Sequence, residues 1–85
     1  MDKIFEQVIF LLEKWGPLPS QDREELREIR YLEEGHIDSF NLTQFILELE
    51  EQFNIVLLPT DTESERFRQI GGLVMLINDK LSELV

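Results

Sequence analysis

The sequence predicts an all-α fold: a small bundle of three main helices and one short helix, with a long first loop. Apolar residues recur at helical spacing in three segments of the chain. Glycine, proline and capping residues separate these segments. The chain has 85 residues, which is the size of one small domain. We therefore expect residues 1–85 to fold as a single domain around one core.

The first helix is predicted over residues 3–15. Its apolar positions lie on one face: Ile4, Val8, Leu11, Leu12 and Trp15. Residues 16–19 (GPLP) end it, because glycine accepts a left-handed turn and proline cannot extend the hydrogen-bond ladder. Within the long first loop, Ser20 is expected to cap a short helical turn over residues 21–29. Three apolar residues would then hold the loop on the core: Leu26, Ile29 and Leu32.

The second helix is predicted from Ser39 to Phe53, with Asn54 as a left-handed stop. Its core stripe consists of Leu42, Phe45, Ile46, Leu49 and Phe53. Residues 55–58 (IVLL) are a short apolar run for which a strand is the alternative. Because no second strand exists to pair with them, we expect an extended loop that is held by its apolar side chains and ended by Pro59.

The C-terminal third contains two further predicted helices. Residues 62–65 (TESE) match the capping-box pattern, which predicts a short helix from there to about Phe67. The last helix is expected to begin near Ile70, and its core positions are Ile70, Leu73, Val74, Ile77 and Leu81. Gly71 and Gly72 should weaken its first turn by roughly 1 kcal/mol each relative to alanine.

Composition narrows the possible functions. The net charge of −10 disfavours nucleic acid and anionic membranes as partners and favours proteins with basic docking surfaces, although it also serves solubility. The absence of cysteine excludes disulfides and thiolate metal sites. The longest apolar run, Val8 to Leu12, is too short to cross a bilayer, and acidic residues stand where a signal peptide would be basic. We expect a cytoplasmic monomer without membrane insertion.

One motif is specific enough to suggest a function. Residues 32–40 (LEEGHIDSF), 49–55 (LEEQFNI) and 67–73 (FRQIGGL) together resemble acyl and peptidyl carrier proteins. The pattern is most similar to free-standing carriers of the D-alanyl carrier type. The resemblance implies that Ser39, preceded by Asp38, is the attachment site of 4'-phosphopantetheine. The sequence departs from the family at Gln69, where threonine is usual, and at Asn41 and Gln44, where many fatty-acid carriers have acids.

Ser39 also has simpler interpretations. A plain N-cap serine is the simplest, and Ser20, Ser64 and Ser82 have the character of caps or solvated positions. A hydrolase could use Ser39 with His36 and Asp38, but the pattern Gly-x-Ser-x-Gly is absent, so we expect no enzymatic activity. His36 has no companion histidine or cysteine for a metal site, and a solvated loop histidine is expected.

A partner-binding face is predicted on the second helix. At about 100° per residue, Phe40 and Leu47 point roughly 150° away from the core stripe and should be exposed. Polar and acidic residues complete this docking face: Asn41, Gln44, Glu48 and Glu51. In the family that the chain resembles, these positions meet partner enzymes.

The sequence thus predicts a carrier that holds an acyl or aminoacyl group as a thioester on phosphopantetheine and presents it to other enzymes, in the biosynthesis of fatty acids or secondary metabolites or in a D-alanyl-type pathway. Its partners would be a phosphopantetheinyl transferase, an acyl- or aminoacyl-activating ligase, and downstream acyl-processing enzymes with basic docking surfaces. The alternative is a helical adaptor that uses the same acidic face without a prosthetic group.

Overall fold

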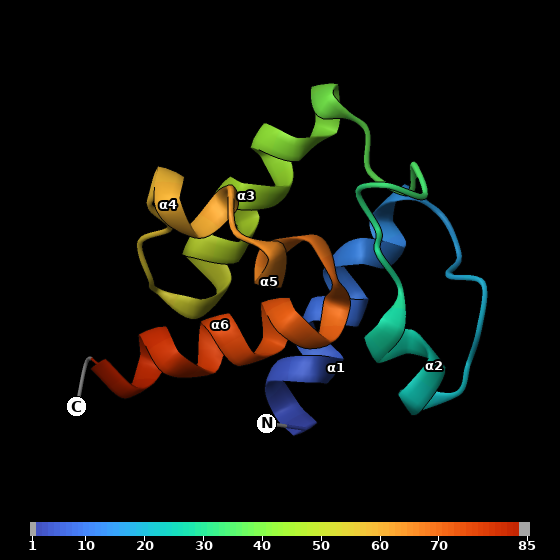
Figure 1. Ribbon diagram of the computed structural model, residues 1–85, viewed down its shortest axis with the longest axis horizontal. Coiled ribbons are helices and arrows are strands. Elements are labelled where there is room, and N and C mark those ends of the chain that lie inside the picture. The colour runs from blue at the N-terminus through green and yellow to red at the C-terminus, as the bar shows by residue number, and fades with distance from the viewer. Residues whose placement is uncertain (1, 84–85) are drawn as a thin grey trace.

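Helix α6 (Ile70–Glu83) lies against several of the other helices of the bundle (Figure 1). In the computed structural model, which describes residues 2–83, α6 contacts α1 (Asp2–Leu12), α2 (Arg23–Glu28) and α5 (Glu65–Arg68). Helix α3 (Ser39–Phe53) packs against α1. No β-strand occurs within residues 2–83, so the predicted all-α bundle is confirmed.

The three main helices form because each one turns an apolar stripe toward the same core. The core contains Phe5, Val8, Leu11 and Leu12 from α1, Phe45, Leu49 and Phe53 from α3, and Ile70, Leu73, Val74, Leu76 and Ile77 from α6. Leu42, Ile46 and Leu81 were also predicted as core residues, and they pack on its edge partly buried. Residues 13–15, predicted as the end of the first helix, form the short 3-10 helix η1 (Glu13–Trp15).

The long first connection is fixed to the core by apolar side chains along its length, namely Leu18, Leu26, Ile29, Tyr31 and Ile37. The backbone N–H of Ile70, at the start of α6, also donates to the carbonyl of Ile29 at 3.0 Å. The predicted Ser20 cap of the short helix is wrong. Asp22 caps α2 instead, because its carboxylate accepts the N–H groups of Glu24 and Glu25.

Residues 55–58 form the predicted extended loop. Ile55 and Leu57 are buried, whereas Val56 and Leu58 are exposed. The carboxylate of Glu50 accepts the N–H of Leu57 at 2.8 Å, which gives this loop donor a partner without a neighbouring strand.

The short helix predicted to end at about Phe67 is present as α5, but its predicted start at Thr62 is wrong: α5 begins at Glu65, and another short helix, α4 (Pro59–Thr62), precedes it. The chain already turns helical at Pro59, where the missing N–H is tolerated in the first turn. Asp61 accepts the N–H of Leu58 at 2.8 Å, and the Thr62 hydroxyl donates back to the carbonyl of Pro59 at 3.2 Å. Thr62 therefore closes α4 instead of capping a following helix.

Candidate functional site

Ser39 is the first residue of α3, and its side chain is exposed at the end of that helix. The preceding residue, Asp38, has an extended backbone, and its carboxylate accepts the N–H of Asn41 at 2.8 Å. Asp38 is therefore the N-cap of α3, and it fixes where the helix begins. Asn54 ends the helix with a left-handed backbone (φ 55°), as predicted.

The loop before Ser39 is anchored in the core by Tyr31. This side chain is 0% exposed, its ring meets those of Phe45 and Phe67 edge-on, and its hydroxyl donates to the carbonyl of Phe67. Burial raises the pKa of Tyr31, so the phenol remains a neutral donor. The Tyr31 carbonyl in turn accepts the N–H of His36 at 3.0 Å, which folds the loop back toward Ser39.

An ion-pair cluster ties the same loop to α5 from the outside. Arg30 pairs with Glu33 and with Glu65 at 2.7 Å each, and Arg68 pairs with Glu33 at 3.3 Å. The hydrogen bonds from Arg30 lower the pKa of Glu33 to about 2. All four side chains are at least a third exposed, so each pair adds little stability. Their effect is to orient the loop relative to α5.

His36 links the loop to α1. Its Nε2 lies 2.7 Å from the carbonyl oxygen of Leu12, the last residue of α1, and the ring is half-buried. A carbonyl only accepts hydrogen bonds, so Nε2 carries the proton. His36 is therefore not the solvated loop histidine that the sequence predicts. The loop packs against the end of α1, and this packing brings His36 and Leu12 together.

The exposed face of α3 carries the two apolar residues that its helical phase predicts. Phe40 is 89% exposed and Leu47 is 53% exposed. Gln44 and Glu51 are exposed on the same helix, while Asn41 is half-buried. The predicted exposure of Phe40 and Leu47 is thus confirmed, and their role in docking stays a prediction.

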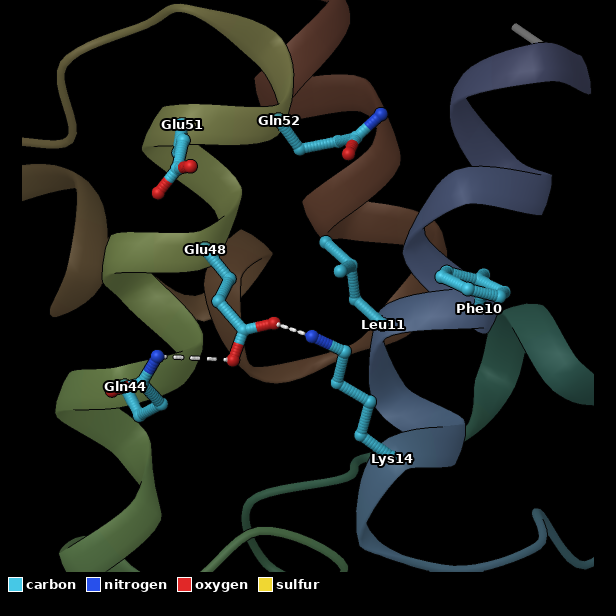
Figure 2. A pocket seen from close by; sticks show the side chains of 7 residues that line it. All are labelled: Phe10, Leu11, Lys14, Gln44, Glu48, Glu51 and Gln52. Atoms are coloured by element: carbon cyan, nitrogen blue, oxygen red, sulfur yellow. Dashed lines mark hydrogen bonds and ion pairs between the residues drawn. The ribbon is translucent and has the colours of Figure 1, made fainter.

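Glu48 differs from the other predicted docking residues because it faces α1 (Figure 2). It forms an ion pair with Lys14 and accepts a hydrogen bond from Gln44 at 3.2 Å. The hydrogen bond from Lys14 lowers the pKa of Glu48, so the carboxylate is held in its charged form. The Glu48 side chain is only 16% exposed. Glu48 therefore connects α3 to Lys14 and is not a freely exposed charge on the docking face.

A groove of about 510 Å³ lies between α1 and α3 around this ion pair. Its walls combine apolar and polar side chains, namely Phe10, Leu11, Lys14, Gln44, Glu48, Glu51 and Gln52. Phe10 is 69% exposed at its edge. No local sequence pattern singles out Lys14 or Phe10, since their relation to α3 depends on how the two helices pack.

Residues 2–83 contain no group of three or more histidine, cysteine, aspartate or glutamate side chains placed to hold a metal ion. Within the same range, no helix has the length and apolar character needed to cross a membrane. What the site offers chemically is an exposed hydroxyl at a helix N-terminus, held by an anchored loop and followed by an exposed aromatic side chain.

Comparisons with protein-family models, curated proteins and solved structures gave no match to this chain.

Proposed function

We propose that the protein is a carrier that holds an acyl or aminoacyl group as a thioester on 4'-phosphopantetheine attached to Ser39. One observation carries the proposal: Ser39 is an exposed serine at the first residue of a long helix, capped by Asp38 and followed by an 89% exposed Phe40. A serine that only begins a helix would require neither an exposed aromatic neighbour nor the carrier-like sequence around it.

The position of Ser39 suits a phosphodiester. The first turn of α3 presents backbone N–H groups and the positive end of the helix dipole, both of which favour an anion. In the loading reaction, the Ser39 hydroxyl oxygen forms a bond to the phosphorus of the pantetheine phosphate of coenzyme A. The bond from that phosphorus to the adenosine bisphosphate breaks, and the hydroxyl proton passes to a base on the transferase.

The chain itself supplies attachment and presentation. Since it contains no cysteine, the thiol that bears the cargo comes from the arm. The cargo is then displayed outside the helical bundle, where separate enzymes load and process it. Because other enzymes do the chemistry, the carrier needs no catalytic pocket of its own. We place the protein in the cytoplasm, where coenzyme A is available.

Partner enzymes would meet the face of α3 beside Ser39. Phe40 and Leu47 are exposed apolar anchors, and Glu51 is an exposed charge close to them in helical phase. With a net charge of −10, the chain attracts partners that have basic docking surfaces. These would be the phosphopantetheinyl transferase, an acyl- or aminoacyl-activating ligase and the downstream acyl-processing enzymes.

The proposal is tested by incubating the purified protein with coenzyme A and a broad-specificity phosphopantetheinyl transferase, followed by intact-mass analysis. The wild type should gain one phosphopantetheine, and Ser39→Ala should gain none while melting at the same temperature. Alanine variants of the other three serines, Ser20, Ser64 and Ser82, should be modified like the wild type. A modified Ser39→Ala protein would show that the attachment site is wrong, and an unmodified wild type would favour the adaptor.

A further inference from the structure

The contact between His36 and Leu12 joins the end of α1 to the segment that leads into Ser39. Leu12 is the last residue of α1 and the N-cap of the 3-10 helix η1. The Nε2–H of His36 donates to the Leu12 carbonyl oxygen at 2.7 Å. The partner residues are 24 positions apart in the chain, so the bond fixes one distant element against another.

The 3-10 helix η1, which directly follows Leu12, is fixed to α3. The Trp15 ring meets the Phe45 ring edge-on at 6.0 Å between centroids, and Lys14 pairs with Glu48. These contacts hold the body of α3 against α1, whereas His36 holds the loop that precedes α3. Leu12 and η1 therefore support both sides of the junction at which Ser39 lies.

His36 is close to Ser39 in the chain, and the residues between them are themselves fixed. Ile37 is 1% exposed in the core, and Asp38 caps the first turn of α3 through Asn41. A shift of the His36 backbone is therefore transmitted through Ile37 to the cap. The cap in turn determines whether the first turn, which begins with Ser39, is formed.

We propose that His36 is a positioning residue for Ser39: through Leu12 it holds the loop so that the first turn of α3 presents the serine hydroxyl in a reactive geometry. This inference rests on the proposed function, because the reaction concerned is the transfer of phosphopantetheine to Ser39. His36 does not touch the reacting atoms. Its loss lowers the fraction of time in which the hydroxyl is correctly placed, and this slows the transfer within the bound complex.

The test compares three variants in the transferase assay at a temperature well below all their melting points. His36→Leu removes the donor and keeps an apolar side chain. His36→Gln places an amide N–H at about the reach of Nε2 and can restore the bond. Ser64→Ala is the matched control, because the Ser64 hydroxyl also donates to a backbone carbonyl, that of Asp61, at 2.7 Å in a half-buried site between α4 and α5.

We expect kcat to fall about 3- to 10-fold for His36→Leu, the range that corresponds to one net hydrogen bond. KM should stay within about twofold of the wild type, because Leu47 and Glu51 lie beyond the first turn and keep their places on the docking face. His36→Gln should recover most of kcat, and Ser64→Ala should behave like the wild type. A His36→Leu protein that melts earlier but keeps the wild-type kcat would show a purely structural role and overturn the proposal.

A second measurement does not depend on the reaction. The Asn41 N–H is bonded to the Asp38 cap, so its hydrogen exchange reports the opening of the first turn of α3. Exchange should be faster in His36→Leu than in Ser64→Ala and should return toward the wild-type rate in His36→Gln. Unchanged exchange in His36→Leu would contradict the positioning role. If the wild type itself is not modified by the transferase, the carrier proposal fails, and the Asn41 exchange still decides the role of His36.

Discussion

The helical phase of α3 can be tested with one substitution made at two positions. Leu47 and Leu49 lie on the same helix, but Leu47 is 53% exposed and Leu49 is 0% exposed in the core. Leu49→Ala removes fully buried methyl groups and leaves a cavity, which costs on the order of 2–5 kcal/mol of unfolding free energy. Leu47→Ala removes little packing and should change stability by no more than about 0.5 kcal/mol. Because the substitution is the same, helix propensity cancels in the comparison.

Urea unfolding followed by circular dichroism measures both costs. In a domain of this size, 1 kcal/mol corresponds to a shift of roughly 4–8 °C in the melting temperature, so Leu49→Ala should melt roughly 10 °C or more below the wild type. Leu47→Ala should melt close to the wild type and should bind the transferase more weakly, with a raised KM. Equal destabilisation by the two variants would show that the assigned phase is wrong, and the docking face with it.

Three further substitutions test other parts of the structure. Asp38→Ala removes the cap of α3 and should cost about 1 kcal/mol in urea unfolding, so an unchanged midpoint would mean that the cap bond to Asn41 adds nothing. Gly72→Ala would place a Cβ 2.5 Å from the backbone carbonyl oxygen of Arg66, so α5 must move, and we expect a loss of roughly 1–3 kcal/mol; wild-type stability in the same unfolding assay would refute this close approach. The hydrogen bonds from Arg30 lower the pKa of Glu33 from its ordinary 4.5 to about 2. Ionised Glu33 therefore stabilises the fold above about pH 4.5, and this contribution is lost as the pH falls toward 2. The stability difference between wild type and Glu33→Gln should therefore shrink across that window in acid titrations monitored by circular dichroism, and a constant difference would contradict it.

The elements that could be predicted from sequence are those whose ends are set by local chemistry. Helix α3 was predicted from Ser39 to Phe53 and found there, because Asp38 is a strong cap and Asn54 accepts the left-handed turn. Helix α6 begins at Ile70, as its apolar spacing predicts.

The region of α4 and α5 could not be predicted in the same way, because several local signals compete there. Residues 62–65 fit a capping box, but Asp61 and Thr62 both bond back to the turn that begins at Pro59. The earlier turn uses the threonine hydroxyl, so the capping-box pattern is present without the structure that it usually indicates.

In the candidate site, too, the features set by neighbouring residues could be predicted, and the contacts between distant residues could not. The exposure of Phe40 and Leu47 follows from helical phase alone, and the cap at Asp38 follows from a pattern of neighbouring residues. In contrast, the partners of His36 and Glu48 lie 24 and 34 residues away in the chain, at Leu12 and Lys14. Contacts at such separations depend on how the helices pack. Local sequence patterns do not predict this packing.

The central claim, that Ser39 carries a phosphopantetheine arm, is tested most directly by the intact mass of the protein after expression in its native host. We expect a mass increase of one phosphopantetheine, which peptide mapping places on Ser39. An unmodified chain, or a modification mapped to any other residue, would contradict it.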